Sequence, residues 1–225
     1  MGRYLPFLIS MCQKILSEHK NVREFIVVSI KSPNDLNHGA AKSGDMLAYF
    51  FRMAMEQSGG KVSIFTDFRS RKFATLAEKR DSMVIAVDDF VGTGDTALKF
   101  LAEFQKVFPD INSRFAIATL VTMKSAKEKI SGLGVKIFSH LICEKGITDH
   151  AKWSYQEKID RTNLMKTLET RIKVLPQYRL GYGQSESLIK MMRTPNNTFP
   201  VFWHTTLYDN IPWPSPFPRH WSAKR

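Results

Sequence analysis

The stretch MVIAVDDFVGTGDTALKFL, residues 83–101, decides how the rest of the chain is interpreted. Its apolar first half predicts a buried strand that ends in two adjacent carboxylates, Asp88 and Asp89. A turn with glycines at positions 92 and 94 follows and opens a helix with apolar residues at helical spacing. Two like charges at a strand end repel each other, whereas the turn beyond them is suited to an anion. One ligand or one reaction should account for both features.

Outward from this stretch, short apolar runs rich in β-branched residues alternate with helical patterns. Strand and helix that alternate along a chain form a parallel sheet with helices on its faces, so we expect an α/β fold. The segment after the second strand, residues 69–82, is basic, carries little periodicity and is expected as a loop. The expected strands are residues 25–30, 61–68, 83–89, 114–123 and 135–145, and the expected helices are residues 45–58, 95–108 and 125–134.

The pattern changes after residue 148. Residues 149–175 are predicted as one long amphipathic helix, and the residues beyond it are rich in glycine, proline and aromatic side chains. We therefore expect an α/β core at residues 1–148 and a helical and irregular extension at residues 149–225, packed on that core. The apolar stripe of the long helix comprises Leu164, Leu168, Ile172 and Leu175.

The charge of the chain points to an anionic partner. Its formal net charge is +12, and residues 150–225 contribute +7, with 12 Lys and Arg against 5 acids. Such a balance suits nucleotide phosphate or nucleic acid, although solubility alone would also explain it. No apolar run approaches the roughly 20 residues that cross a bilayer, so no membrane partner is expected. Two cysteines are too few for a disulfide framework or a zinc site, which favours a cytoplasmic location.

The glycine turn fits three kinds of phosphate site, and two of them fail. Residues 92–97, GTGDTA, match the dinucleotide fingerprint, but the next strand ends in LVTMKS and offers no acid for a ribose hydroxyl. A Walker A loop is excluded because no Gly-Lys-Ser or Gly-Lys-Thr follows. A third account places a phosphate on the N–H groups of the turn and the helix N-terminus, with Asp88 and Asp89 accepting from two ribose hydroxyls. The ligand is then a ribose 5-phosphate with free 2- and 3-hydroxyls.

VIAVDDFVGTGDT, residues 84–96, resembles the binding motif for 5-phosphoribosyl-1-pyrophosphate (PRPP) of the type I phosphoribosyltransferases. The match comprises four apolar residues, two acids, two apolar residues and then x-Thr-Gly-x-Thr. The resemblance implies that family's parallel sheet and pentosyl transfer or cleavage at ribose C1. It also implies Mg²⁺, held mainly by ligand oxygens and water and not by a dedicated protein site. By the same resemblance, PRPP or a nucleotide contacts Asp88, Asp89, Val91, Gly92, Thr93, Gly94, Asp95 and Thr96.

The resemblance implies two further segments. A pyrophosphate loop lies within residues 38–44, and residues 69–82 form a flexible hood loop with Lys72 among its basic residues. The acids would orient the ribose and balance positive charge on it, while the basic residues stabilise the departing pyrophosphate. Purine salvage members carry, at the position of Gly92, an aspartate that accepts a proton from the base, so purine salvage is not expected here. The pyrophosphate-loop candidates are Ala41, Lys42, Ser43 and Gly44, and the catalytic candidates are Asp88, Asp89, Lys42, Arg69 and Arg71.

LGYGQSESLIKMMRTPNNTFPVFWHTT, residues 180–206, is similar to the C-terminal part of a bacterial phosphoribosyltransferase-like group. That group carries a C-terminal extension and is associated with conflict and antiviral defence systems, including retron-type systems. The extension is either a cap that packs Phe199, Phe202 and Trp203 onto the sheet, or a surface for nucleic acid or a partner protein. Two function classes follow: an enzyme acting on PRPP or a nucleotide, and a non-catalytic sensing or binding module that keeps the ribose-phosphate pocket. A homodimer is also left open.

Overall fold

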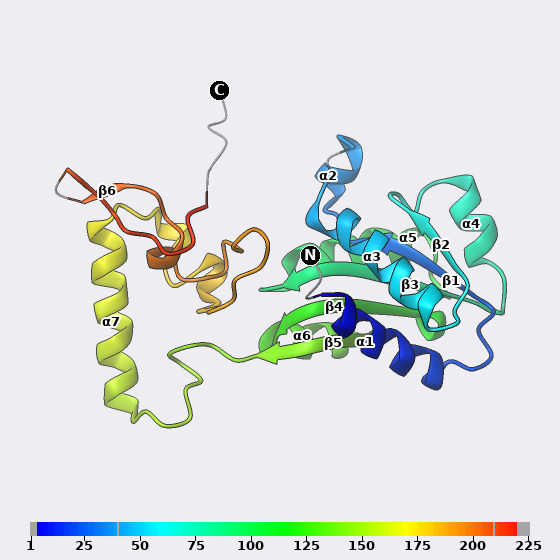
Figure 1. The fold of residues 1–225 in the computed structure, drawn as a ribbon, viewed down its shortest axis with the longest axis horizontal. Coiled ribbons are helices and arrows are strands. Elements are labelled where there is room, and N and C mark those ends of the chain that lie inside the picture. Colours follow the sequence, from blue (N-terminus) through cyan, green and yellow to red (C-terminus); the bar gives the residue numbers. More distant parts are fainter. Residues whose placement is uncertain (1–3, 40, 209, 220–225) are drawn as a thin grey trace. The chain divides into compact units, whose positions relative to one another are not determined.

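The structure, a computed structural model, describes residues 4–39, 41–208 and 210–219 (Figure 1). The chain divides into two compact units, one ending at Ile142 and one beginning at Cys143, and each is described by itself. The strands of the first unit are β1 (Glu24–Ser29), β2 (Val62–Phe65), β3 (Ser82–Val91), β4 (Phe115–Met123) and β5 (Lys136–Cys143). Its helices are α1 (Leu5–Glu18), α2 (Pro33–Asn37), α3 (Ser43–Gln57), α4 (Arg71–Ala77), α5 (Asp95–Val107), the short η1 (Asn112–Arg114) and α6 (Lys124–Ser131).

The first unit is built on one five-stranded sheet with strand order β2-β1-β3-β4-β5. The pairs β1–β2, β1–β3 and β3–β4 are parallel, which confirms the predicted α/β fold with a parallel sheet flanked by helices. Every residue of β1 and β4 is buried, as expected for central strands covered on both faces. Because parallel strands end at one edge, Asp88 and Asp89, near the carboxyl end of β3, lie just beyond the last residue of β1, Ser29, which pairs with Val87. The register pairs Asp88 with Thr119.

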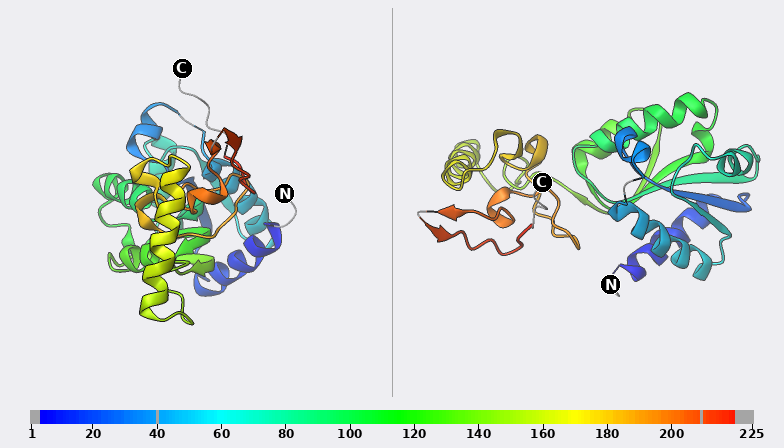
Figure 2. Two further views of the ribbon diagram at one scale, coloured as in Figure 1. Left: turned by 90° about the vertical axis from the view of Figure 1, so that its left-hand side faces the viewer. Right: turned by 90° about the horizontal axis from the view of Figure 1, so that it is seen from above.

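Helices cover both faces of this sheet. Helix α3 packs on α1 and on strands β1, β2 and β3, and α1 and α3 lie on the face opposite α5 and α6 (Figure 2). Aromatic rings fill the space beside α5. The ring centroid of Phe68 lies 5.3 Å from those of Phe100 and Phe104, and Phe104 lies 4.8 Å from Phe115. Such contacts exclude water and fix α5 and its N-terminus against the sheet.

The expected hood loop differs from the sequence-based expectation, and the N-terminal segment, for which no element was predicted, is helical. Residues Leu5–Glu18 form α1, whose buried Leu8, Cys12 and Ile15 recur at helical spacing. Within residues 69–82, expected as a flexible loop, Arg71–Ala77 form α4. The Ser70 hydroxyl caps this helix and accepts a hydrogen bond from the Phe73 N–H at 3.3 Å. Two buried residues, Phe73 and Ala77, in a seven-residue helix are too few to produce a clear periodic signal. Among the described residues, no helix is long and apolar enough to cross a membrane.

The second unit has its own hydrophobic core. Buried Ile172, Phe199 and Val201 belong to one cluster, and the Trp203 indole N–H donates to the Thr198 carbonyl at 2.6 Å. The elements are α7 (Tyr155–Arg171), η2 (Pro176–Tyr178), η3 (Tyr182–Gln184), η4 (Pro200–Phe202) and the antiparallel pair β6 (Leu207–Tyr208) and β7 (Ile211–Pro212). Phe199, Phe202 and Trp203, considered above as a cap for the sheet, thus contribute to a core formed by residues of this unit.

Helix α7 is shorter than the helix expected at residues 149–175. It begins after Ser154, whose hydroxyl accepts from the Glu157 N–H while the Glu157 carboxylate accepts from the Ser154 N–H. It ends at Arg171, and Lys173 adopts a positive φ of 57° that no helix continues through. Of the predicted apolar stripe, Leu164 and Leu175 are 60% and 56% exposed.

The Gly-Tyr-Gly element, residues 181–183, contacts the Pro-Asn-Asn element, residues 195–197, through backbone atoms. Gly181 has a φ of 79°, and a Cβ atom at this position would lie 1.9 Å from the carbonyl oxygen of Asn197. The Tyr182 N–H donates to the Asn196 carbonyl at 2.9 Å, and the Ser185 hydroxyl donates to the Asn197 carbonyl at 2.8 Å. The glycine is therefore required by close backbone approach as well as by its dihedral angle. These contacts show a structural role for the Gly-Tyr-Gly and Pro-Asn-Asn elements.

Candidate functional site

The strongest candidate site lies where β3 ends and α5 begins. The strand was expected to end at Asp89, but β3 continues through Val91, which pairs with Thr122 of β4, so Asp88 and Asp89 lie just before its end. Val91 and Gly92 are buried at the start of the turn that follows. Gly94 adopts a φ of 86°, and a Cβ atom there would lie 3.4 Å from that of Ala126. A glycine thus lets the turn reverse and pack against α6. The turn delivers the chain into α5, whose first N–H groups have no partner within the helix and carry the positive end of its dipole.

Thr93, Asp95 and Thr96 form the outer side of this turn. Asp95 and Thr96 are exposed, and the Asp95 N–H donates to the Thr93 hydroxyl at 3.3 Å. The Lys129 ammonium group donates to the Thr93 carbonyl at 3.3 Å, so a positive charge from α6 reaches the same turn. A turn with two threonines that leads into a helix N-terminus, with a lysine beside it, has the composition of a phosphate-binding turn.

The two carboxylates are electrostatically coupled. Burial raises the pKa of Asp88 well above its ordinary value, and the negative charge of Asp89 raises it further. The Asp89 N–H donates to the Asp88 carboxylate at 2.9 Å. This hydrogen bond and the positive charge of Lys42 both lower the pKa of Asp88, but the net shift remains upward. Asp88 therefore retains a proton at pH values where an exposed aspartate is ionised. Hydroxyl donors or a cation at this position would stabilise its charged form.

The expected pyrophosphate loop lies against the same strand end. The Ser43 hydroxyl donates to the Asp89 carboxylate at 2.8 Å, across 46 residues of sequence. Gly44 is buried, and a Cβ atom on it would lie 3.2 Å from the Val87 carbonyl oxygen and 3.6 Å from the Asp88 carboxylate. Only a glycine lets the loop approach β3 this closely without displacing atoms. Ala41, Lys42 and Ser43 are exposed, and Ser43 and Gly44 begin α3.

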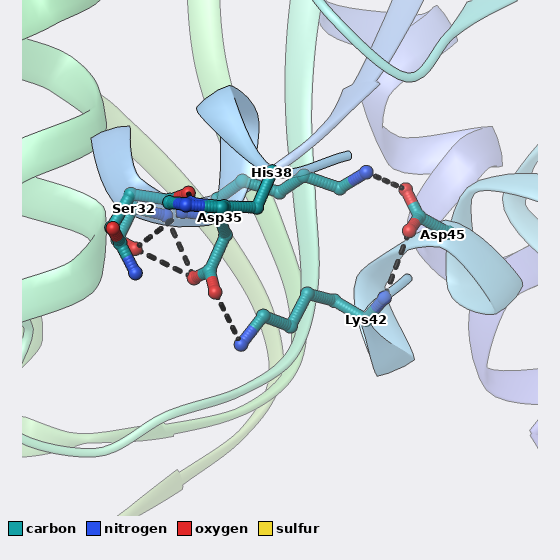
Figure 3. Close-up of polar contacts among 7 residues, drawn as sticks. Ser32, Asp35, His38, Lys42 and Asp45 are labelled. Carbon is teal, nitrogen blue, oxygen red and sulfur yellow. Dashed lines mark hydrogen bonds and ion pairs between the residues drawn. The ribbon is translucent and has the colours of Figure 1, made fainter. Parts of the chain in front are cut away.

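An ion-pair network holds this loop in place (Figure 3). The Lys42 ammonium group lies 2.8 Å from the Asp35 carboxylate, and the Lys42 backbone N–H donates to Asp45 at 2.9 Å. Buried Lys31, just beyond β1, lies 2.9 Å from the other oxygen of Asp45, which also accepts from Ser29. Burial alone would raise the pKa of Asp45, but the hydrogen bonds from Ser29, Lys42 and Lys31 outweigh it and lower that pKa. The loop is thus anchored to the ends of β1 and α2.

Sequence reasoning missed these anchoring residues. Ser32 and Asp35 form a capping box at the start of α2, and this short-range pattern is recognisable as a helix start. Lys31 and Asp45 are separated by a loop and a helix, so their pairing depends on the fold. The available signal was a lysine directly after a buried strand, at the edge where the two aspartates were also expected. Such a lysine is seldom buried unless it is paired.

The basic residues of the expected hood loop are placed differently from one another. The Arg69 guanidinium group donates to Asp67 at 2.7 Å and to the Asn37 side chain at 2.8 Å, which links this segment to α2. Arg71 and Lys72 occupy the first turn of α4 and are exposed. The hydrogen bond that Arg69 donates to the Asp67 carboxylate raises the pKa of Arg69. Arg69 is therefore held beside α2 by a carboxylate and an amide, while Arg71 and Lys72 face solvent.

The donor set at the strand end fits Mg²⁺ better than a metal held by protein alone. Within the described parts of the chain, no group of three or more His, Cys, Asp and Glu side chains could hold a metal ion. Asp88 and Asp89 provide two adjacent carboxylates with crowded charge, and Asp88 holds its negative charge at an energetic cost. Mg²⁺ commonly binds one or two carboxylates together with water and the phosphate oxygens of a ligand.

A family model named PRTase-CE matches residues 9–219, which is almost the whole chain. The chain belongs to the PRTase-CE family. This result agrees with the resemblance of residues 84–96 to a phosphoribosyltransferase motif, and it extends over both units. No curated protein matches the chain.

Solved structures similar to this PRTase-CE chain include known phosphoribosyltransferases. Schistosoma mansoni hypoxanthine-guanine phosphoribosyltransferase in complex with IMP is 14% identical, with a TM-score of 0.41 over 64% of this chain and 63% of that one. Mycobacterium tuberculosis orotate phosphoribosyltransferase in complex with PRPP is 15% identical, with a TM-score of 0.39 over 63% and 75%. A Neisseria gonorrhoeae protein with bound ppGpp is 14% identical, with a TM-score of 0.42 over 64% and 81%. The chain therefore spans less than two thirds of the schistosome enzyme.

Proposed function

We propose that this PRTase-CE protein binds PRPP or a ribose-5-phosphate-containing nucleotide at the end of β3 and acts at ribose C1. The observation that supports it best is the 2.8 Å hydrogen bond from Ser43 to Asp89. It brings together the carboxylate pair and the loop that begins α3, as one ligand carrying a ribose and a pyrophosphate would require. In this proposal, residues 1–148 form the phosphoribosyltransferase-like domain and residues 149–225 form its extension.

Each part of the ligand has a matching group in the protein. The 5-phosphate lies on the turn of residues 92–96 at the N-terminus of α5, where backbone N–H groups and hydroxyls converge. The ribose 2- and 3-hydroxyls donate to Asp88 and Asp89, which therefore bind as carboxylates. The pyrophosphate lies at residues 41–44, with the charge of Lys42 close by. These positions fix C1 between the carboxylates and the pyrophosphate loop.

The reaction then requires little covalent chemistry from the protein. The bond between C1 and the pyrophosphate oxygen breaks, and pyrophosphate leaves with the electron pair. An acceptor nitrogen, or water in a cleavage reaction, donates its lone pair to C1 and loses a proton to solvent. Asp88 and Asp89 balance the positive charge that develops on the ribose ring, which is electrostatic stabilisation of the transition state. When bound, Mg²⁺ neutralises charge on the pyrophosphate, and Asp88 and Asp89 are the residues that would hold it.

In this proposal, the protein differs from purine salvage enzymes in the acceptor that it uses. Gly92 has no side chain with which to accept a proton from a base. We therefore propose either an acceptor recognised by other residues or cleavage by water. The resemblance of residues 180–206 supports a cytoplasmic role in bacterial antiviral defence, of the kind associated with retron-type systems.

A second candidate is a sensor that binds the same ligand without turning it over. The observation that favours it is Arg69, whose guanidinium group is engaged with Asp67 and Asn37. An arginine so held contributes less to a departing pyrophosphate than one directed at it. The sensor would retain Asp88 and Asp89 for binding and report the ligand to a partner protein or a second copy of the chain.

Calorimetry and a pyrophosphate assay test both candidates. The enzyme should bind PRPP only weakly without Mg²⁺, bind it tightly with Mg²⁺, and release pyrophosphate in the presence of water or a panel of nucleobases. Binding without release would identify the sensor. If neither PRPP nor nucleoside monophosphates give heat with Mg²⁺, the proposed ligand class is wrong.

A further inference from the structure

The short helix α2 holds two of the basic residues expected to stabilise a departing pyrophosphate. Its Asp35 carboxylate lies 2.8 Å from the Lys42 ammonium group (Figure 3), and its Asn37 side-chain oxygen accepts from the Arg69 guanidinium group at 2.8 Å. Lys42 lies directly before α3, whereas Arg69 lies before α4, beyond strand β2. One helix therefore links two cations that the proposed reaction brings to the same ligand group.

Both cations are already neutralised by carboxylates. Arg69 donates to Asp67 from Nε at 3.0 Å and from Nη2 at 2.7 Å, and Lys42 pairs with Asp35. Burial alone would raise the pKa of Asp35, but hydrogen bonds from Lys42 and Ser32 outweigh it and lower that pKa, so Asp35 is ionised at neutral pH. A pyrophosphate oxygen that binds Lys42 would share one ammonium group with this carboxylate, and two anions on one cation lie close enough to repel each other. Asp35 therefore opposes the ligand group that Lys42 attracts.

Few buried contacts keep α2 in place. All five of its residues are described, and Leu36 is the one that is buried. The Asp35 carboxylate also accepts from the Ser32 N–H at 3.3 Å and from its hydroxyl at 2.6 Å, which closes the first turn but adds no contact outside residues 32–37. The Lys42 side chain is 42% exposed, and exposed ion pairs contribute little to stability. A segment held in this way can open while the sheet stays folded.

We propose that α2 is a latch that holds Lys42 and Arg69 in these contacts until a pyrophosphate group displaces Asp35 and Asn37 from them. The latch rests on the proposed PRPP-binding function and adds to it the groups that oppose binding. Ribose 5-phosphate carries no pyrophosphate and leaves α2 in place. In an enzyme, the latch frees both cations only when the leaving group is present. In a sensor, the displaced α2 distinguishes PRPP from ribose 5-phosphate.

Calorimetry with Mg²⁺ tests the latch with two variants and a matched control. Asp35→Asn keeps the size of the side chain, and Asn37→Ala releases Arg69 without a change of charge. The control, Glu103→Gln, removes a carboxylate from an ion pair of 2.6 Å with Lys106 on α5. Asp35→Asn should bind PRPP about threefold more tightly than wild type, in keeping with the small contribution of an exposed ion pair. Asn37→Ala should change PRPP affinity in the same direction. Ribose 5-phosphate affinity should stay at the wild-type value in both variants, and the control should match wild type for both ligands.

Hydrogen exchange on the wild type gives a readout that a general change of charge does not produce. The Leu36 and His38 N–H groups donate to the Ser32 and Asn34 carbonyls, in α2 and its caps. A five-residue helix is not stable without its anchoring contacts, so both amides should exchange faster with saturating PRPP than without it. Ribose 5-phosphate should not change their exchange. This measurement needs no variant, so it decides the question if Asp35→Asn does not fold, which thermal melting would reveal.

Three results would overturn the latch while the proposed function stands. They are weaker PRPP binding by Asp35→Asn at an unchanged melting temperature, equal gains in affinity for PRPP and ribose 5-phosphate, and slower or unchanged exchange in α2 on addition of PRPP. The first would show that Asp35 positions Lys42 for the ligand, and the second that Asp35 contributes only a nonspecific negative potential. If wild type binds neither ligand, the proposed function is wrong, and the latch survives only if inorganic pyrophosphate accelerates exchange at Leu36 and His38.

Discussion

Replacing Asp88 with asparagine should separate the destabilisation that this carboxylate causes in the unliganded protein from its contribution to ligand binding. Asparagine keeps the size of the side chain and an oxygen that accepts from the Asp89 N–H, now 2.9 Å from the Asp88 carboxylate. It removes the negative charge that burial and Asp89 disfavour. The unliganded variant should therefore be more stable than wild type wherever Asp88 is ionised, and it should bind the ribose-phosphate ligand more weakly.

The pH dependence gives the sign of the stability effect. Because the folded-state pKa of Asp88 is raised, its contribution to stability is fully present below the unfolded-state pKa and is lost as pH rises through the folded-state value. The melting temperature of the wild type should thus decline more steeply than that of Asp88→Asn between about pH 4 and about pH 8. Asp110→Asn, at an exposed loop position, removes the same charge and should melt like wild type.

The affinity loss follows from the kind of hydrogen bond that is replaced. A hydrogen bond to a charged group contributes about 1.5–3 kcal/mol and one between neutral groups about 0.5–1.5 kcal/mol. Asp88→Asn should therefore cost about 1–1.5 kcal/mol, or roughly a tenfold increase in the Kd for PRPP measured by calorimetry with Mg²⁺. Wild-type affinity should also rise with pH, while that of the variant stays flat. A variant that binds PRPP as tightly as wild type and melts at a lower temperature at both pH values would refute the reasoning.

Three further predictions concern other parts of the chain. Gly181→Ala should destabilise the second unit by about 3 kcal/mol or more in thermal melts, because its Cβ would collide with the Asn197 carbonyl. Gly134→Ala, where no atom lies within 4 Å of the added Cβ, should cost only about 1 kcal/mol for its positive φ. Burial raises the pKa of Glu169 to about 7, so its stabilising contribution is lost as pH rises through that value, and Glu169→Gln should flatten urea-unfolding stability between about pH 5 and pH 8. A triple alanine variant of Arg69, Arg71 and Lys72 should bind PRPP much more weakly in calorimetry while its affinity for ribose 5-phosphate changes little. Equal losses of affinity for both ligands would show that these residues contribute only a nonspecific positive potential.

The sheet was predictable because its signals are local. Five apolar runs are long enough to identify buried strands, and the alternation with helical segments determines a parallel arrangement. The position of Asp88 and Asp89 near the carboxyl end of a strand followed from the same pattern, although β3 continues for two residues beyond them, because Phe90 and Val91 still pair with β4. The resemblance to the phosphoribosyltransferase motif, with the order of elements along the chain, also placed residues 41–44 at that edge.

The remaining features depend on contacts that are distant in sequence. Lys31 meets Asp45 only once β1 and α3 are in place, and Arg69 meets Asn37 across a helix and a strand. Helix α4 escaped prediction because tertiary packing of Phe73 and Ala77, more than helical propensity, stabilises so short an element. In α7, the apolar residue Leu164 is exposed, so hydrophobic spacing overestimated the buried face.

The carboxylate of Glu186 has a consequence for the time at which each unit can fold. It accepts from the N–H groups of Ile147 and Thr148 at 2.9 Å and 2.7 Å, across 39 and 38 residues. The N–H groups of Ile147 and Thr148 therefore lack this carboxylate partner during synthesis until the ribosome has released the chain beyond Glu186. All strands of the first unit precede this segment, and domains generally fold as units from the N-terminus. The proposed ribose-phosphate site should accordingly form on the nascent chain before the second unit does, so a ribosome stalled after α7 would display this site without a folded second unit.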